Sequence, residues 1–351
     1  MPAETGAILL TGATGFLGGE VLRRIIDGTD RDVVTITRRS LGIDHPRVRQ
    51  LRADFSEGPL PPLPSDIDTV VHCAASVAFD LPIEEQRAIN VVGTQRVMDA
   101  AAALPGLRRF MHVSTAFVAG SHEGPFGPED LDRGQTFRNT YEQSKFEAEQ
   151  HVAASGLPTQ VVRPSIVVGD QHTGWTTSFN VIYGPLRAYA KGLMNVAPGQ
   201  VDAPVDLVPI DVVADGMALL LGEPVGGTHL LVSGPKAPTV GEFVELAAAR
   251  FDRPPAFVVD PAVLVEVIDA LPADEAMKAR RALEQAGTLL PYFDVRCAFD
   301  DPATAALLAG SGITVPYLRD YLGVLVDFAE TARWGKRKPE PAPLTRQEAG
   351  A

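Results

Sequence analysis

Tyr141 and Lys145 stand four residues apart in a segment with the pattern of a helix, so both side chains should project from one face. An ammonium group near a phenol favours the phenolate and lowers the phenol's pKa, which would let Tyr141 exchange a proton at neutral pH. Ser114 and Thr115 end an apolar run, and Thr115 lies 26 residues before Tyr141. A hydroxyl at that strand end could hydrogen-bond an oxyanion beside the phenol. These residues therefore indicate proton transfer coupled to hydride transfer at a carbonyl group.

A glycine loop, TGATGFLG at 11–18, lies between the apolar run AILL at 7–10 and an amphipathic stretch at 19–26. A strand, a glycine turn and a helix in this order form a cradle for the phosphates of a dinucleotide. Gly12 would allow the tight turn, Gly15 the approach of a pyrophosphate, and Gly18 the close packing of helix on strand. The loop predicts a nicotinamide cofactor. It has no GK[ST] ending, so it does not indicate a nucleotide-hydrolysing phosphate loop.

The choice of cofactor depends on the end of the second predicted strand, where an acidic side chain would bind the 2'-hydroxyl of the adenosine ribose. The strand at 33–37 is followed instead by Arg38 and Arg39. Guanidinium groups suit a 2'-phosphate, and no carboxylate stands at this point of the sequence to repel one. We therefore predict NADPH. The alternative is that the two arginines only solvate the strand end.

Short apolar runs alternate with helical patterns through the first half of the chain. We expect strands at 8–11, 33–37, 69–73, 109–114 and 160–168, and helices at 19–26, 84–103 and 141–155. This alternation predicts an α/β fold, a doubly wound parallel sheet (Rossmann) with helices on both faces. Ligands of such sheets lie at the carboxyl ends of the strands, where the glycine loop, Ala74-Ala75, Ser114-Thr115 and Pro164 should converge.

The second half of the chain contains two further segments that predict helices and strands. The pattern resumes at 207–210, where Asp211 is placed to cap a helix through Leu221. A strand at 229–232 and helices at 240–251, 274–286 and 317–333 follow. We expect an NADP-binding Rossmann domain from 1–170 and 206–224, and a smaller, mostly helical substrate-binding lobe from 171–205 and 225–335. The segment 336–351 is rich in Pro, Glu and Lys and should be disordered.

Composition excludes several classes of function. The net charge of −13 and the short, scattered basic clusters argue against nucleic-acid binding. The two cysteines, Cys73 and Cys297, have no metal-type spacing, which predicts a metal-free protein in a reducing compartment. The start MPAETGAILL lacks the features of a signal peptide, and no apolar run is long enough to span a membrane. We expect a soluble cytoplasmic protein, monomeric or homodimeric.

Taken together, these motifs resemble those of the extended short-chain dehydrogenase/reductase family, and within it the branch of fatty acyl-CoA reductases and thioester reductase domains. The blocks that carry the resemblance lie within the first 215 residues or so. They are TGATGFLG at 11–18, HCAASVAFD at 72–80, INVVGT at 89–94, HVSTAFV at 112–118, NTYEQSKFEAE at 139–149, RPSIVVGD at 163–170 and LVPIDVVAD at 207–215.

The resemblance implies that Thr115, Tyr141 and Lys145 are the catalytic residues, with Lys145 also binding the nicotinamide ribose. It places Asp54 and Phe55 beside the adenine, and Pro164 to Ile166 beside the nicotinamide amide. The expected cofactor-binding residues are Gly12, Thr14, Gly15, Phe16, Leu17, Gly18, Arg38, Arg39, Asp54, Phe55, Ala74, Ala75, Ser114, Tyr141, Lys145, Pro164 and Ile166.

One departure from the family pattern bears on the substrate. Sugar-nucleotide epimerases and dehydratases of this family usually place an asparagine three residues after the arginine of this strand, where this chain has Ile166 after Arg163. An apolar side chain cannot replace the asparagine's contact with a diphosphate, so a sugar-nucleotide substrate is disfavoured. Apolar residues expected around the cleft would suit an acyl chain. They are Val77, Phe79, Phe117, Trp175, Phe179, Tyr183 and Leu186.

Three hypotheses follow for the function. The first is NADPH-dependent reduction of an acyl thioester, carried by coenzyme A or a carrier protein, to the aldehyde, with a second reduction to the alcohol left open. The second is an NADP-dependent ketone or aldehyde reductase, or a hydroxyl dehydrogenase, acting on a steroid-like or polyketide-like molecule. The third is a non-catalytic NADP-binding regulatory subunit, which an intact set of Thr115, Tyr141 and Lys145 disfavours.

Overall fold

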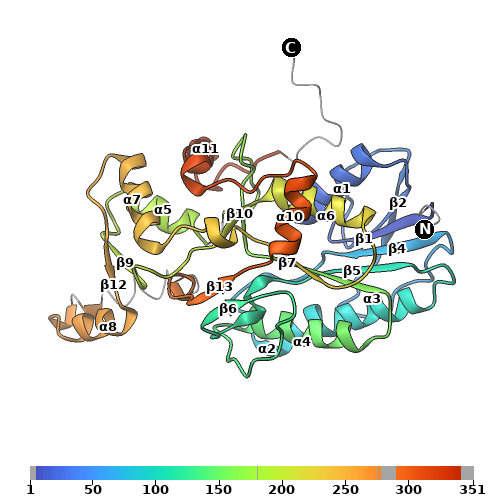
Figure 1. The fold of residues 1–351 in the computed structure, drawn as a ribbon, viewed down its shortest axis with the longest axis horizontal. Coiled ribbons are helices and arrows are strands. Elements are labelled where there is room, and N and C mark those ends of the chain that lie inside the picture. Colours follow the sequence, from blue (N-terminus) through green and yellow to red (C-terminus); the bar gives the residue numbers. More distant parts are fainter. Residues whose placement is uncertain (1–4, 180, 275, 278–289, 341–351) are drawn as a thin grey trace, which may run out of the picture.

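The computed structural model of the protein describes residues 5–179, 181–274, 276–277 and 290–340. Its centre is a seven-stranded sheet with the strand order β11-β7-β5-β4-β1-β2-β3, and every pair in it is parallel (Figure 1). The predicted doubly wound Rossmann architecture is confirmed. The strands are β1 (Ala7–Thr11), β2 (Val33–Thr37), β3 (Val48–Arg52), β4 (Ile67–His72), β5 (Arg109–Val113), β7 (Thr159–Pro164) and β11 (Thr228–Leu231).

Both faces of the sheet are covered by helices, and its central strands β1, β4 and β5 are therefore buried along their whole length. In β1, Ile8 and Leu10 pack into one core with helices α1 (Phe16–Gly28) and α6 (Ile210–Gly222). Leu9 faces the opposite core with α3 (Gly93–Ala102) and α4 (Thr140–Ala154). Figure 1 shows the two helix layers on opposite sides of the sheet. The glycine loop, which follows β1, and the start of α4 both lie at the carboxyl ends of the strands.

The segment predicted as one strand at 160–168 is two strands in the structure. β7 ends at Pro164, and β8 (Ile166–Val168) pairs with β10 (Leu207–Pro209) in a separate sheet. Proline has no amide hydrogen to continue the ladder, so the chain leaves the main sheet there. The prediction of a single strand was wrong, and the break lies at the carboxyl end of β7.

The long helix predicted at 84–103 contains a wide turn. It consists of α2 (Ile83–Arg87), a π-helical turn (Ala88–Val92) and α3. The π turn carries Asn90, whose side chain bonds to the backbone of Ser76 and to the Ser144 hydroxyl. Strand β3 was not predicted, because its polar, half-buried sequence VRQLR becomes a strand only by pairing with β2.

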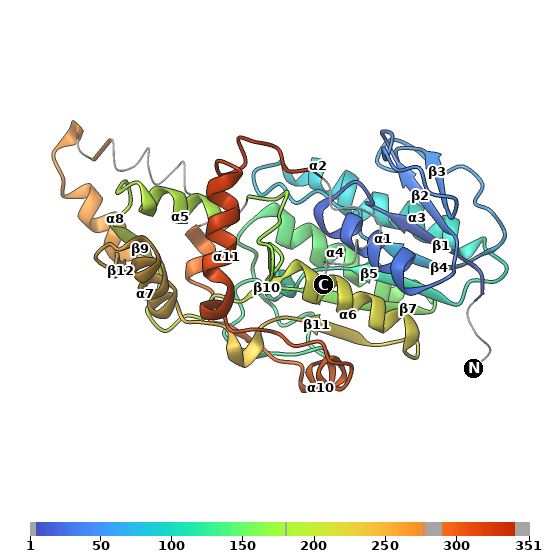
Figure 2. The same cartoon turned by 90° about the horizontal axis from the view of Figure 1, so that it is seen from above.

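The smaller lobe lies at one end of the molecule in both views (Figures 1 and 2). The helix predicted at 240–251 forms with those bounds and begins with a capping box between Thr239 and Glu242. The elements of this lobe are α5 (Tyr183–Ala190), β9 (Val196–Pro198), α7 (Val240–Phe251), β12 (Phe257–Val259), α8 (Pro261–Asp269) and α11 (Leu318–Thr331). Two short strands, β6 (Gly124–Phe126) and β13 (Cys297–Phe299), pair with each other.

The expected domain boundary needs a correction. Strand β11, which we assigned to the lobe, is the edge strand of the main sheet and pairs with β7. In helix α10 (Pro302–Gly310), Leu308 packs into the core that contains α1 and α6. The sequence of a four-residue strand does not indicate which strand it pairs with, so the assignment of β11 to the main sheet depends on long-range pairing. The helix predicted at 274–286 lies largely outside the described residues.

Two further expectations concern helix ends and the end of the chain. Asp211 does not cap α6: Pro209 precedes the helix, and the Asp211 carboxylate accepts hydrogen bonds from Gln171 instead. Of the segment 336–351, residues 336–340 are described, and the Glu340 carbonyl accepts a bond from the Trp175 indole. Residues 341–351 lie outside the described part. Within the described residues, no helix has the length and apolarity needed to cross a membrane.

Candidate active site

The glycine loop has the close approaches that the sequence predicted. Gly12 has a φ of +77°, and a Cβ there would lie 2.7 Å from the amide nitrogen of Ala74. A Cβ at Gly18 would lie 2.2 Å from the carbonyl oxygen of Gly12, so helix α1 rests directly on the turn. A side chain at either position would collide with backbone. The loop therefore brings the start of α1 against the end of β1.

The start of α1 is suited to an anion. Gly15 is the N-cap residue and offers no side-chain hydrogen bond, so the first amide groups of the helix keep their donor capacity. Nearby, the buried Ser114 hydroxyl has no hydrogen-bond partner among the described residues. A dinucleotide fits both features, because its pyrophosphate accepts from helix amides and its nicotinamide half carries polar groups.

Side chains from three regions of the sequence meet in one cleft at the carboxyl ends of the strands. Ser114 and Thr115 follow β5, Tyr141 and Lys145 come from the first turns of α4, and Pro164 ends β7. Asn139 caps α4 by accepting a 2.9 Å bond from the Glu142 amide. The structure thus brings the whole predicted catalytic set to the glycine loop.

The phenol of Tyr141 does not have the lowered pKa that the sequence predicted. Burial raises the pKa of Tyr141 to about 12, while a hydrogen bond with the Thr115 side chain acts in the opposite direction. The expectation was wrong for this state because the Lys145 ammonium group bonds elsewhere, to the Val113 carbonyl at 2.8 Å. Tyr141 is therefore a protonated phenol here, which suits a proton donor.

Lys145 is 2% exposed and carries its charge at an energetic cost. Burial lowers the pKa of Lys145 to about 8. Its Nζ lies 3.4 Å from Nε2 of His112, which packs against His72 with ring centroids 5.6 Å apart. Burial holds the pKa of both histidines below its usual value, to about 3 for His72. The histidines are therefore neutral, and they support the lysine without competing for protons.

The expected residues divide into those that line the cleft and those that do not. Val77, which is 55% exposed, stands at its surface, with Phe79 and Phe117 as walls. The predicted residues that line the cleft are Gly12, Gly15, Phe16, Leu17, Gly18, Ala75, Val77, Phe79, Ser114, Thr115, Phe117, Tyr141, Lys145, Pro164 and Ile166. Those outside its lining are Thr14, Arg38, Arg39, Asp54, Phe55, Ala74, Trp175, Phe179 and Tyr183.

Tyr183 is a core residue rather than a cleft wall. It is 2% exposed, and its hydroxyl accepts a 3.0 Å bond from the Gly169 amide. Phe179 packs on the Tyr183 ring at 5.4 Å. Leu186 lines a separate cavity. The sequence could not separate these aromatics from true wall residues, because apolar side chains look alike whichever surface buries them.

The arginines expected to bind a 2'-phosphate follow β2, and both are exposed. The Arg38 side chain is 73% exposed and lies 3.7 Å from the Asp54 carboxylate. We expected no carboxylate near the arginines that follow β2. This expectation was wrong, because Asp54, just after β3, lies beside Arg38 in the folded protein. A hydrogen bond with Ser56 is the main cause that lowers the pKa of Asp54.

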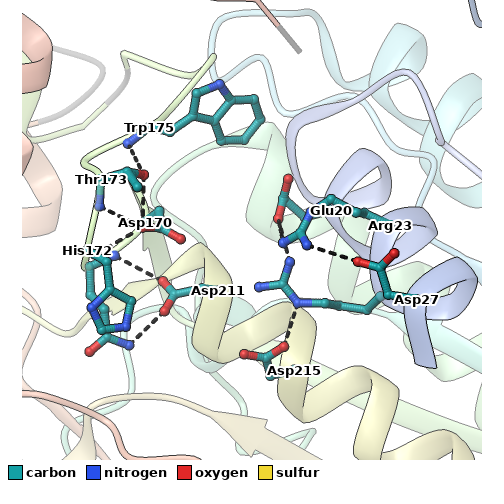
Figure 3. Close-up of polar contacts among 11 residues, drawn as sticks. Glu20, Arg23, Asp27, Asp170, His172, Thr173, Trp175, Asp211 and Asp215 are labelled. Carbon is teal, nitrogen blue, oxygen red and sulfur yellow. Dashed lines mark hydrogen bonds and ion pairs between the residues drawn. The ribbon is translucent and has the colours of Figure 1, made fainter. Parts of the chain in front are cut away.

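Trp175 covers the glycine loop from the side of the lobe. Its ring lies 5.7 Å from that of Phe16. The loop that carries Trp175 folds around Asp170, whose carboxylate accepts from the His172 and Thr173 amides, and Asp211 holds it to α6 through Gln171 (Figure 3).

An ion-pair network joins α6 to the first helix. Arg24 binds Asp215 on α6 at 2.5 Å and Glu20 on its own helix at 2.8 Å, and Figure 3 shows this network beside the Trp175 loop. Helix α6 thus bonds both to the Trp175 loop, through Asp211, and to helix α1, through Asp215.

The sequence reasoning missed several cleft residues. The most distant is Tyr292, whose ring packs on Phe79 at 5.3 Å and on Phe117 at 4.9 Å. No local pattern marks Tyr292, because it reaches the cleft only through tertiary packing. The other missed residues are Cys73, Val113, Ser165, Val167, Ser178 and Val181.

Comparisons with known proteins agree with this site. The family model described as male sterility protein matches residues 56–217. The terminal R domain from the myxalamid PKS-NRPS biosynthetic pathway superimposes with a TM-score of 0.78 at 25% identity, over 97% of this chain and 94% of that chain. The predicted resemblance to extended short-chain dehydrogenase/reductases is confirmed. The enzyme class that the sequence predicts, an oxidoreductase, is also the class named for the fatty acyl-CoA reductases among the relatives.

Sequence relatives of the chain include proteins named for the predicted branch. Fatty acyl-CoA reductase 1 of Mus musculus is 29% identical over 271 residues, which are 59% of this chain and 53% of that protein. A linear gramicidin synthase chain of Brevibacillus parabrevis is 28% identical over 254 residues, 62% of this chain and 5% of that protein. The chain spans about half the length of the fatty acyl-CoA reductases that it matches. UDP-glucuronic acid 4-epimerase from Bacillus cereus shares the fold, with a TM-score of 0.68 at 19% identity, over 94% of this chain and 98% of that chain.

Proposed function

We propose that the protein is an NADPH-dependent reductase that converts an acyl thioester, carried by coenzyme A or a carrier protein, to the aldehyde. One observation carries the proposal: Thr115, Tyr141 and Lys145 meet the glycine loop in a cleft whose other walls are mainly apolar. The names of the relatives, fatty acyl-CoA reductases and an R domain, support the same substrate class.

The cleft favours an acyl group over a sugar nucleotide. Ile166 lines it where the sugar-nucleotide enzymes of the family have asparagine, so a diphosphate would lose its anchor. Phe79, Phe117 and Tyr292 form an aromatic wall beside Tyr141. Such a wall suits an apolar chain that approaches the catalytic hydroxyls.

The chain's residues would act as follows. NADPH, when bound, supplies a hydride to the thioester carbonyl carbon and is oxidised to NADP⁺. Thr115 donates a hydrogen bond to the carbonyl oxygen, and Tyr141 gives its proton to that oxygen as the C=O pair moves onto it. The resulting hemithioacetal then loses its hydroxyl proton as the C–S bond breaks. The products are an aldehyde and a thiol, and the proton released from the hydroxyl group ends on the sulfur.

Lys145 would hold the nicotinamide ribose and restore the proton of Tyr141. It lies one helical turn from Tyr141, and its pKa of about 8 lets it give up a proton near neutral pH. Ser114, with its unpartnered hydroxyl, would face the cofactor. NADPH is preferred over NADH because Arg38 and Arg39 follow β2.

The test is NADPH oxidation by the purified protein with acyl-CoA thioesters, while free thiol and aldehyde are measured in parallel. We expect one thiol released per NADPH consumed and an aldehyde product. Two NADPH per thiol would indicate reduction to the alcohol. Turnover with simple ketones or aldehydes but with no thioester would overturn the proposal in favour of the second hypothesis.

A further inference from the structure

The ammonium group of Lys145 is held by two consecutive residues of β5. Its Nζ donates a 2.8 Å hydrogen bond to the Val113 carbonyl and lies 3.4 Å from Nε2 of His112. Both side chains are buried, since Lys145 is 2% and His112 0% exposed. Strand β5 continues directly into Ser114 and Thr115 at the cleft. The strand that carries the cleft hydroxyls therefore also fixes the position of the ammonium group.

The His112 ring can bind the Lys145 ammonium group only as an acceptor. An ammonium group has three N–H donors and no acceptor, so the ring nitrogen that faces it has to be unprotonated. The proton of the neutral ring then lies on Nδ1, which has no hydrogen-bond partner among the described residues. Burial and the nearby Lys145 charge hold the pKa of His112 well below its usual value. His112 is therefore a neutral ring whose acceptor nitrogen faces Lys145.

The neighbouring His72 has the opposite tautomer, and its hydrogen bonds determine it. The Thr94 hydroxyl donates its proton to the Asn90 carbonyl at 2.6 Å, so it can only accept from Nε2 of His72, 3.0 Å away. The Nδ1 atom of His72 then accepts from the Thr11 hydroxyl at 2.7 Å. The His72 and His112 rings lie 5.6 Å apart. Because both nitrogens of His72 are already bonded, this ring does not exchange a proton with His112.

Other titratable groups near Lys145 come from α4 and from the end of β4. On α4, the Glu149 carboxylate raises the pKa of Lys145, and it is bound to Arg163 of β7 at 3.0 Å. Cys73, just after β4, is a neutral thiol because burial raises its pKa to about 12. The phenol of Tyr141 is protonated as well. These groups affect the charge of Lys145, whereas its hydrogen bonds within the described part of the chain go to β5.

We infer that His112 is a positioning residue for the reaction, which holds the ammonium group of Lys145 in place beside the cleft. The inference rests on the proposed function, because it uses the role of Lys145 in restoring the proton of Tyr141. Two of the three N–H groups of Lys145 are directed to Val113 and His112, so the third can serve the phenol or a cofactor hydroxyl. A neutral acceptor also stabilises the ammonium form where burial disfavours it.

The first experiment determines the tautomers of the seven histidines in the natural protein by nuclear magnetic resonance. Long-range proton–nitrogen spectra of histidine-labelled protein are recorded below the Lys145 pKa of about 8. We expect His112 to be neutral, with its proton on Nδ1. The His112→Gln variant, which lacks one set of signals, assigns this ring. A proton on Nε2 of His112, or a doubly protonated ring, would overturn the inference.

The second experiment follows the titration of Lys145 through the free energy of unfolding. In the natural protein this free energy should begin to rise at about pH 8, where the folded state starts to bind fewer protons than the unfolded chain. His112→Leu removes the acceptor, so the onset should move down by about one pH unit. His112→Gln should restore it, because its amide oxygen is also an acceptor. Met111→Leu, a buried change on the same strand, should leave the onset in place.

The pH profile of kcat connects this titration to the reaction. The alkaline fall of kcat should move down with the onset in His112→Leu and return in His112→Gln. An onset that is the same in His112→Leu and the natural protein would overturn the inference while the reductase proposal stands, since neither the spectra nor the unfolding data need a substrate. Absence of turnover with every thioester would instead defeat the proposed function itself.

Discussion

The Asn139 side chain donates a 2.9 Å hydrogen bond to the phenolic oxygen of Tyr292, 153 residues later in the chain. Asn139 also caps helix α4 through the Glu142 amide, and Tyr292 bonds to the buried Glu142 carboxyl group. Burial raises the pKa of Glu142. The first turn of the catalytic helix is therefore tied to the lobe that carries the aromatic wall.

Tyr292→Phe is expected to lower the free energy of unfolding by about 1–3 kcal/mol, because Asn139 and Glu142 lose a buried partner. The ring contacts with Phe79 and Phe117 remain, so kcat should fall less than in Tyr141→Phe. Chemical denaturation gives the stability, with Tyr317→Phe as the control because its side chain is exposed. Equal free energies of unfolding for the two variants would show that the hydrogen bond between Asn139 and Tyr292 does not stabilise the fold.

Tyr141→Phe should reduce kcat more than about a hundredfold, since the phenylalanine ring keeps the packing but has no proton to give. NADPH binding should stay within about threefold of the natural protein, because the ribose contact is assigned to Lys145. Single-turnover kinetics and a fluorescence titration of NADPH separate the two effects. A folded, NADPH-bound variant that still turns over would refute the role of this phenol.

Lys145→Met tests the charge state of the buried lysine. The folded-state pKa of Lys145 is about 8, below the ordinary 10.5, so the folded protein binds fewer protons than the unfolded chain between these values. The natural protein should therefore gain stability relative to Lys145→Met as the pH rises from about 8 to about 10.5, by roughly 3 kcal/mol in total. Below about pH 8 the difference should be flat. A difference that stays constant to pH 10.5 would mean that burial does not lower the pKa.

Gly18→Ala should weaken NADPH binding and destabilise the fold by about 1–3 kcal/mol. The new Cβ would lie 2.2 Å from the Gly12 carbonyl, and backbone on both sides prevents relief. Gly19→Ala is the matched control, because its Cβ would meet only the Ala13 carbonyl at 3.5 Å. That control should gain about 0.5–1 kcal/mol, as alanine favours a helix. Equal loss in both variants would argue against a close loop–helix contact.

Replacing Arg38 and Arg39 together by alanine should raise the Kd of NADPH about tenfold to a hundredfold, because charge-assisted bonds to the 2'-phosphate are lost. The Kd of NADH should not change. Arg49→Ala is a control that removes an exposed arginine paired with Asp66 on the same domain. Equal catalytic efficiency of the natural protein with the two cofactors would remove the preference for NADPH altogether.

The local patterns of the sequence predicted what local geometry controls. The glycine spacing predicted the turn between β1 and α1, and the four-residue spacing of Tyr141 and Lys145 placed both on one face of α4. The alternation of apolar runs and helical stretches predicted the doubly wound sheet, because a strand that helices cover on both faces is mainly apolar. The departure at Ile166 could likewise be read from its position in a motif.

Strand pairing, the lining of the cleft and the pKa values of buried groups depend on tertiary contacts, which local patterns do not contain. β11 joins the main sheet by pairing with a strand more than 60 residues earlier, and Tyr292 reaches the cleft from the other lobe. The raised pKa of Tyr141 and the lowered pKa of Lys145 both arise from desolvation, which is a property of the packed neighbours rather than of spacing. Local patterns thus predicted the elements and the candidate catalytic residues, whereas long-range packing gives these residues their environment, because periodicity indicates which face of an element is buried but not which partner covers it.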